Sequence, residues 1–161
     1  MECPHCGQQL ELFTQTYDIP YFGMVLQSTF VCSCSYKLVD IYPFEEKEPS
    51  RYILKISQPE LNTRVVKSST CIILVPELGV RVDPGPASEG IITNTEGILR
   101  RIEHAVKMGI HWGNHQQKKE GKKILKKLKR IFNGEETATL IVEDPRGFSF
   151  IVSEKAQKEL L

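Results

Sequence analysis

Four cysteines near the start of the chain fall into two short clusters whose spacing suits the binding of a metal ion. Cys3 and Cys6 can bring both sulfurs onto one ion through a tight turn, and Gly7 can take the left-handed conformation that lets backbone amides approach them. Cys32 and Cys34 form a second cluster that is one residue shorter than the usual pair. Residues two apart in extended backbone point to the same side, so both thiolates could still reach the ion. In that case the second cluster would lack the tight turn, or knuckle, that is expected at Cys3 and Cys6.

The spacing favours one structural Zn²⁺ ion bound by Cys3, Cys6, Cys32 and Cys34. A catalytic zinc normally keeps three protein ligands and an open position, whereas four thiolates close the site, and a redox pair is the remaining alternative. Because the second cluster is contracted, Cys34 is the least secure ligand and His5 is the obvious spare. The fifth cysteine, Cys71, opens an apolar run, and we expect it to be a small buried hydrophobic residue.

Composition places the chain in the ordinary globular range. Its 161 residues are 40% hydrophobic and 25% charged, enough for one domain or for a small module and one domain. The first residues lack the basic and apolar regions of a signal peptide, and no apolar run is long enough for a membrane span. Clustered cysteines suit a reducing compartment. We therefore expect a soluble cytoplasmic protein that binds no membrane.

Strand patterns place the cysteines in a first module, residues 1–44. Its strand-like stretches are 10–17, 24–31 and 37–42, between and after the two clusters, which is the arrangement of a zinc ribbon. A charged segment bounded by prolines follows at 43–50, and prolines there disfavour continued pairing. We place the boundary at this segment, with a second domain at 45–161.

The second domain is expected to be mainly β with an α insertion. Short strands are predicted at 52–56, 65–66, 71–75, 80–82, 137–142 and 148–152, followed by a short polar helix at the end of the chain. A helical hairpin is predicted at about 94–133. Thr93 and Glu96 have the form of a capping box for its first helix, which ends near Gly109, and the second helix covers roughly 116–132.

The second predicted helix carries most of the positive charge of the chain. Residues 118–130 hold eight Lys or Arg and one Glu, a local charge of +7 in a chain of net charge +1. Such a run commonly solvates the outer face of an amphipathic helix. It could also contact an acidic protein surface, or nucleic acid in a salt-dependent manner. The candidate contact residues on this helix are Lys122, Lys123, Lys126 and Lys127.

An aromatic loop in the first module is a second candidate contact. Tyr17, Pro20, Tyr21 and Phe22 lie within a few residues of one another. Some of these side chains must pack against the small sheet, so burial is the simpler interpretation. A ribbon has little interior, however, and exposed aromatic residues are typical anchors of an interface. We hypothesise that Tyr21 and Phe22 touch a protein partner.

Five segments give the chain a resemblance to the Zpr zinc-finger family, in the short single-module form typical of archaea. They are CPHCG at 3–7, IPYFG at 19–23, SYK at 35–37, GIITNTEGIL at 90–99 and TLIVEDPRG at 139–147. The chain departs from the family pattern in three places. The family has C-x-x-C-Gly where this chain has the segment from Cys32 to Ser35, a small or polar residue where Phe148 stands, and usually Thr or Ser where Asn94 stands.

The resemblance implies a zinc ribbon followed by a double-stranded β-helix, a jelly-roll-like domain, with an inserted helical hairpin. It also implies a non-enzymatic protein that binds translation elongation factor 1-alpha and assists its folding, with the ribbon and the neighbouring hairpin as the contact surface. The alternative is a zinc ribbon associated with RNA or the ribosome through the lysine-rich helix. We expect no small-molecule substrate, because a β-barrel metalloenzyme needs several histidines on barrel strands and residues 51–86 contain none.

His111 and His115 are four residues apart, a spacing at which two histidines on one helix can share a metal ion. Gly113 lies between them and no nearby carboxylate supplies a third ligand. A solvent-facing turn of the hairpin is the better explanation of the pair.

Overall fold

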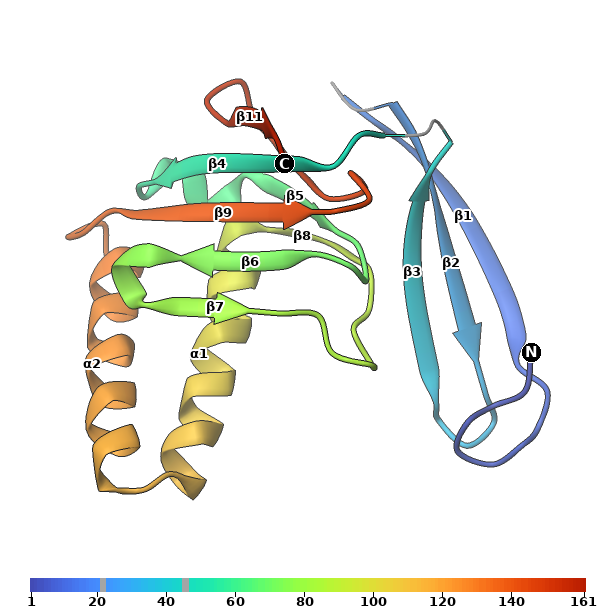
Figure 1. Cartoon of the computed structure of the whole chain (residues 1–161), viewed down its shortest axis with the longest axis horizontal. Coiled ribbons are helices and arrows are strands. Elements are labelled where there is room, and N and C mark those ends of the chain that lie inside the picture. Colours follow the sequence, from blue (N-terminus) through green and yellow to red (C-terminus); the bar gives the residue numbers. More distant parts are fainter. Residues whose placement is uncertain (21–22, 45–46) are drawn as a thin grey trace.

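The computed structural model describes residues 1–20, 23–44 and 47–161, and the chain is mainly β with two helices, as predicted (Figure 1). Its strands are β1 Glu11–Ile19, β2 Gly23–Val31, β3 Lys37–Pro43, β4 Ser50–Ile56, β5 Arg64–Lys67, β6 Ile72–Val75, β7 Val80–Val82, β8 Ile91–Asn94, β9 Ala138–Asp144, β10 Phe150–Val152 and β11 Gln157–Leu160. Its helices are α1 Thr95–Trp112 and α2 His115–Phe132, and short 3-10 turns lie at Pro59–Asn62 and Pro76–Leu78. Neither described helix is long and apolar enough to cross a membrane.

The first three strands form a separate antiparallel sheet in the order β1-β2-β3, which we call the ribbon. Its strands confirm the three stretches predicted from the sequence, although β1 and β2 run further toward the turn that joins them. Strand β1 is an edge strand of nine residues, and its first six residues are all exposed. The ribbon therefore presents a long, open edge on one side of the molecule.

The rest of the chain folds into two antiparallel sheets, with strand orders β10-β5-β8 and β11-β4-β9-β6-β7. Alternating residues of β4, β6 and β9 form the core with apolar residues from both helices, as the period of two along a strand requires. Cys71 is buried in this core, as predicted from the apolar run that follows it. Strand β8 was not predicted, because it lies directly between the Pro/Gly-rich connection and α1.

The helical hairpin interrupts the strand order between β8 and β9. Ile98 and Leu99 of α1 and Leu128 and Ile131 of α2 are almost fully buried, so one stripe of each helix packs into the core. Gly121 lies where the two helices meet, since a Cβ atom built on it would be 2.5 Å from Cγ1 of Ile110. The hairpin thus rests on the domain by its apolar stripe and leaves its lysines exposed.

The predicted cap of α1 is wrong by one residue. The N-cap is Asn94, whose Oδ1 accepts a hydrogen bond from the amide of Gly97 at 2.8 Å. Thr93 belongs to β8 instead, and the Glu96 carboxylate binds Arg100. The helix also continues past Gly109 to Trp112.

The short polar helix predicted at the end of the chain is also wrong. Residues Gln157–Leu160 form β11, which pairs with β4 at the edge of the five-stranded sheet. All four residues are exposed, and the first three are polar, so the sequence shows none of the alternation of apolar and polar residues that predicts a strand. Tertiary pairing with the edge of β4 decides the conformation.

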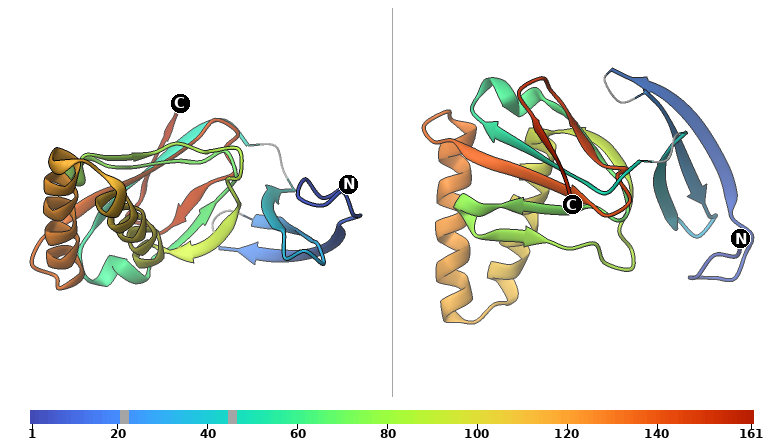
Figure 2. Two further views of the ribbon diagram at one scale, coloured as in Figure 1. Left: turned by 90° about the horizontal axis from the view of Figure 1, so that it is seen from below. Right: turned by 45° about the horizontal axis from the view of Figure 1, so that its top comes forward.

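The ribbon joins the two-sheet domain through a second apolar cluster. Ile19, Val25 and Ile41 of the ribbon are buried against Val66 of β5 and Phe150 of β10. The three views of the molecule place the ribbon at one end and the helical hairpin at the other (Figures 1 and 2). The hairpin is therefore not a neighbour of the ribbon, contrary to our expectation of one shared contact surface.

Candidate metal centre and contact surfaces

The four cysteines of the two sequence clusters come together at the end of the ribbon. Their sulfur atoms all lie within 4.8 Å of one another. The Sγ atoms of Cys3 and Cys34 are 3.6 Å apart, and those of Cys6 and Cys32 are 3.4 Å apart. These distances are far above the disulfide bond length of about 2.0 Å, so the cysteines are free thiols grouped around a common centre.

The first knuckle has the turn expected from its sequence. The amide of Gly7 donates to the carbonyl of Cys3 at 2.9 Å, and Gly7 has a φ of 74°, in the left-handed region. The amide of Gln8 donates to the sulfur of Cys6. A donor aimed at sulfur stabilises a thiolate, which is the form that binds a metal.

The contracted second cluster keeps its turn, contrary to the expectation of extended backbone. The amide of Ser35 donates to the carbonyl of Cys32 at 3.0 Å, and the amide of Cys32 donates to the carbonyl of Tyr36 at 2.9 Å. Ser35 has a φ of 70°, the left-handed conformation that a glycine adopts at low cost. Ser35 thus occupies the conformation that Gly7 has in the first knuckle.

Backbone amides also approach the sulfurs of the second cluster. The amide of Cys34 donates to the sulfur of Cys32, and this bond is the main cause that lowers the pKa of the Cys32 thiol to about 6. The amide of Tyr36 donates in the same way to the sulfur of Cys34. At Cys6 and Cys34 the amide also lowers the pKa, but hydrogen bonds with the neighbouring thiols and burial outweigh it and raise the pKa of the thiol. The backbone amides therefore favour the thiolate most clearly at Cys32.

Local packing supports the cluster from one side. Cys3 and Cys32 are buried with Leu10, and partly buried Phe30 and Tyr36 cover them. His5 packs edge-on against Tyr36, with ring centroids 4.9 Å apart, and is not among the residues that converge on the centre. Cys6 and Cys34 are exposed, so the centre opens to solvent at the tip of the ribbon.

Two of the aromatic-loop candidates, Tyr17 and Pro20, lie at the opposite end of the ribbon. Tyr17 is half-buried in the cluster that joins the ribbon to the domain, and its hydroxyl donates to Oε1 of Gln15 at 2.9 Å. Pro20 is exposed. Tyr21 and Phe22 lie outside the described residues. Burial of Tyr17 agrees with a packing role, while Pro20 remains accessible.

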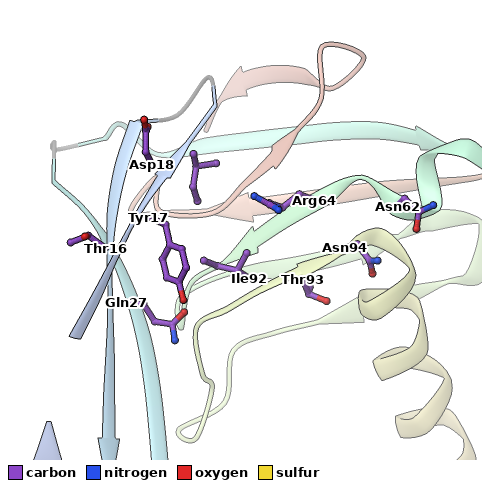
Figure 3. A pocket seen from close by; sticks show the side chains of 10 residues that line it. Thr16, Tyr17, Asp18, Gln27, Asn62, Arg64, Ile92, Thr93 and Asn94 are labelled. Carbon is purple, nitrogen blue, oxygen red and sulfur yellow. The ribbon is translucent and has the colours of Figure 1, made fainter. Parts of the chain in front are cut away.

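A cleft of about 800 Å³ adjoins this end of the ribbon. Figure 3 shows Tyr17 and Asp18 of β1 on one side of it and Arg64, Ile92 and Thr93 of the domain on the other. Most of the groups that line it are polar. The cleft is thus a polar surface that is shared by the two parts of the molecule.

The four candidate lysines of α2 are all exposed. Lys123 forms an ion pair with Glu120 at 3.1 Å, and Lys127 donates to the backbone carbonyl of Glu77 at 2.8 Å. Lys122 and Lys126 also lie on the outer face of the helix. Two of the four lysines thus have intramolecular partners, in agreement with a solvated helix face.

His111 and His115 are exposed on either side of the turn between the helices. The ring of His111 packs edge-on against Trp112 at 4.8 Å, and neither histidine belongs to the four-residue group that could hold a metal ion in the described part of the chain. The explanation as a solvent-facing turn fits this arrangement.

Sequence reasoning missed the exposed apolar residues of the ribbon. Leu12 and Phe13 of β1 are 55% and 57% exposed, and Met24 of β2 is 45% exposed. Their strand assignment was correct, but a strand pattern does not reveal that both faces of β1 lack a covering layer over its first six residues. Exposed apolar groups often mark an interaction surface.

The structure has a four-cysteine centre on a small ribbon, and this ribbon is joined to a two-sheet β domain with a helical insertion. These features define a ribbon protein that is able to hold a metal ion. The family model of the ZPR1 jelly-roll domain matches residues 59–160. The chain therefore belongs to the ZPR1 family.

Two archaeal relatives match this chain over almost its whole length. A ZPR1-like protein of Methanocaldococcus jannaschii is 42% identical over 100% of this chain and 84% of its own length. A ZPR1-like protein of Pyrococcus horikoshii is 34% identical over 99% of this chain and 75% of its own length. The zinc finger chaperone zpr1 of Schizosaccharomyces pombe is 32% identical over 62% of this chain and 22% of its own length.

Proposed function

We propose that Cys3, Cys6, Cys32 and Cys34 bind one structural Zn²⁺ ion. Zinc prefers four tetrahedral ligands in such sites, and a Zn–S distance of about 2.3 Å requires sulfur separations of about 3.8 Å. The two shortest separations described above, 3.4 and 3.6 Å, are close to this value. Four thiolates complete the coordination sphere, so the ion has a structural role in this proposal.

The zinc proposal is tested by metal analysis of the purified chain. We expect one zinc per chain in the wild type and a substoichiometric content in Cys34→Ser. Cys71→Ala is the matched control, because Cys71 is buried in the other core and should leave the zinc content unchanged. A metal-free wild type that still folds would contradict the proposal.

We further propose that the chain is a non-enzymatic cytoplasmic protein-interaction factor that binds translation elongation factor 1-alpha and assists its folding. The observation that carries the interaction role is the ribbon itself, an arm with Leu12 and Phe13 exposed toward the end that can hold a metal and Met24 exposed toward the other end. The name of the S. pombe relative as a zinc finger chaperone supports an action on other proteins. The identity of the partner rests on resemblance to the family.

The proposed contact includes Tyr17 and Pro20, at the end of the ribbon away from the cysteines, and the residues that follow them in the sequence, Tyr21 and Phe22. Pro20 is exposed, and Tyr17 anchors the start of the loop in the junction between ribbon and domain. The lysines of α2, at the other end of the molecule, would meet a second part of a large partner.

The test is binding of purified elongation factor 1-alpha to the zinc-loaded chain in a pull-down. Alanine at both Tyr21 and Phe22 should abolish binding while zinc content and thermal melting stay unchanged. The control is Thr14→Ala, at an exposed position in the middle of β1. Unchanged binding of the double variant would show that the aromatic loop is not the contact.

The lysine-rich face of α2 supports a second candidate function, which is association with RNA or the ribosome. The outer face of α2 is rich in exposed lysines, and binding of such a face to phosphates would fall steeply with added salt. Nuclease treatment of a pull-down from cell extract distinguishes the two candidates. Loss of all partners on nuclease treatment would favour RNA, whereas retention of the elongation factor would favour the protein partner.

A further inference from the structure

A second cavity, of about 600 Å³, lies on the two-sheet domain away from the metal centre. Its walls come from α1, from β6 and β7, and from the connection between β7 and β8. That connection runs along the side of the domain that faces the ribbon (Figure 1). Known small-molecule sites have volumes of about 300–1,000 Å³, so the cavity has the size of a ligand pocket.

The floor of the cavity is apolar. Ile73, Ile98 and Ile102 line it and are each no more than 5% exposed, and half-buried Ile91 adds to the wall. Val82, at the rim, is 40% exposed. An apolar chain bound here would remove both its own surface and that of the rim from water, which is favourable.

Lys67 fixes the wall opposite α1. Its ammonium group donates to the carbonyl of Glu89 at 2.9 Å, to the hydroxyl of Ser88 at 3.0 Å and to the carbonyl of Ser68 at 3.2 Å. All three acceptors are neutral, so these bonds hold the connection in place without neutralising the charge. Burial is the main cause that lowers the pKa of Lys67, and the positive charge of Arg101 acts in the same direction.

Arg101 supplies a second positive charge at the mouth of the same cavity. Its side chain is exposed, and no carboxylate in the described part of the chain forms an ion pair with it. Its neighbour Arg100 differs, because Glu96 and Glu103 both bind that guanidinium. Asp83 at the rim is paired with Arg81. The remaining charged groups that line the cavity are Glu89, Lys67 and Arg101, which together have a net positive charge.

We propose that this cavity binds a small amphiphilic carboxylate, with its apolar chain on Ile73, Ile98 and Ile102 and its carboxylate on the guanidinium of Arg101. The apolar floor selects the chain, and the planar guanidinium can bind a carboxylate through two parallel hydrogen bonds. Lys67 acts as a positioning residue, since its own donors are already used in holding the wall.

The experiment is a titration of the zinc-loaded full chain with octanoate, followed by the methyl signals of isotope-labelled isoleucines. We expect saturable shifts at Ile73, Ile98 and Ile102, and none at Ile19 and Ile41 in the other apolar cluster. Octanol, which has the same chain without the charge, should bind more weakly. Shifts at all five isoleucines, or equal affinities for octanoate and octanol, would overturn the proposal.

Two pairs of variants test the two halves of the site. Arg101→Ala should weaken octanoate binding by about tenfold or more, since hydrogen bonds to charged groups have that strength, and should leave octanol binding unchanged. Lys107→Ala, an exposed cation further along α1, is its control. An effect of Lys107→Ala equal to that of Arg101→Ala would contradict a specific site.

The second pair closes the cavity. Ala105 is exposed at the rim, so Ala105→Phe should fill the mouth and abolish binding of both probes without disturbing the core. His104→Phe places the same ring at the preceding exposed position, which does not line the cavity, and should bind octanoate as the wild type does. Full octanoate binding by Ala105→Phe would place the ligand elsewhere and overturn the proposal.

Discussion

At the scale of single residues, the metal centre depends on how two unequal cysteine clusters reach the same geometry. All four cysteines were identified from sequence, because the spacing of thiols carries their chemistry directly. The turn of the second cluster was not, since it depends on a serine in a conformation that sequence patterns assign to glycine. The family has a glycine after its second cysteine pair, whereas this chain has Ser35. This difference was the signal of the turn that the sequence contained, because Ser35 adopts a φ of 70°, a value typical of glycine.

This conformation makes Ser35 a sensitive position. A left-handed φ costs a residue with a side chain about 1–2 kcal/mol, and the cost is higher for a β-branched side chain. We expect Ser35→Val to weaken zinc binding by about tenfold, because folding of the ribbon and metal binding are coupled. Ser35→Gly should bind zinc at least as tightly as the wild type. Competition with a chromogenic chelator measures both.

Ser33→Thr is the matched control for this prediction. Ser33 lies in the same turn and is exposed, but among the described non-glycine residues only Ser35 has a positive φ. Threonine is β-branched, as valine is, and keeps the hydroxyl that donates to Gln8. The control should therefore retain most of the affinity. If Ser33→Thr and Ser35→Val weaken zinc binding equally, the strain at Ser35 is not what limits the second knuckle.

At the scale of elements, the sequence predicted those that carry their own apolar pattern. The ribbon strands, β4, β9 and both helices have such a pattern and were found. Strands β8 and β11 were missed, because β11 is fully exposed and β8 is a four-residue segment that pairs with β5 just before α1 begins. Their conformations follow from partners distant in the chain, which no local pattern contains.

An ion pair joins two of these elements and predicts a dependence of stability on pH. Glu60, in the 3-10 turn after β4, binds the ammonium of Lys155 at 2.6 Å and also accepts from Ser57. The Lys155 bond, and then the Ser57 bond, lower the pKa of the Glu60 carboxyl from its ordinary 4.5 to about 2. The carboxylate therefore stabilises the fold above pH 4.5, and this contribution is lost as the pH falls toward 2.

We expect Glu60→Gln to melt at a lower temperature than the wild type at neutral pH, with the difference closing between pH 4.5 and pH 2. Thermal melting followed by circular dichroism at a series of pH values measures it. Glu11→Gln, at an exposed position of β1, is the control and should follow the wild type at every pH. A difference for Glu60→Gln that stays constant down to pH 2 would show that the ion pair does not stabilise the fold.

At the scale of the whole molecule, the ribbon is packed against the domain rather than attached by a linker alone. The sequence predicted a boundary in the charged segment at 43–50, and composition there gave no sign that the two parts share a core. The apolar cluster of Ile19, Val25, Ile41, Val66 and Phe150 shows that they do. Phe148, which departs from the family pattern, adds an edge-on contact with Tyr42 of β3, with ring centroids 6.2 Å apart.

This packing fixes the direction in which the ribbon projects. Full burial of an apolar side chain contributes about 1.5–3 kcal/mol, so a cluster of five such residues can hold the ribbon in one orientation. The exposed side chains at its far end are then presented at a fixed distance from the domain. A rigid arm loses less entropy on binding a partner than a flexible one, which favours the proposed interaction role.

At Gly90 the backbones of the two parts lie in close contact. Its amide donates to the carbonyl of Val39 at 2.7 Å, and a Cβ atom built on it would lie 2.9 Å from the backbone nitrogen of Ile41. The opposing atoms belong to the backbone of β3, which cannot move without shifting the ribbon. We expect Gly90→Ala to destabilise the chain by about 1–3 kcal/mol, as overpacking does elsewhere, in chemical denaturation of the zinc-loaded protein.

The loop that contains Gly90 offers its own control. A Cβ atom on Gly85 meets no atom within 4 Å, so Gly85→Ala should leave the stability and the methyl signals of Ile19 and Ile41 unchanged. In Gly90→Ala those two signals should shift, because the ribbon must move away from the domain to admit the added carbon. Equal stabilities and unshifted signals for the two variants would mean that the ribbon already moves freely, and the fixed projection of its exposed side chains would then have to be abandoned.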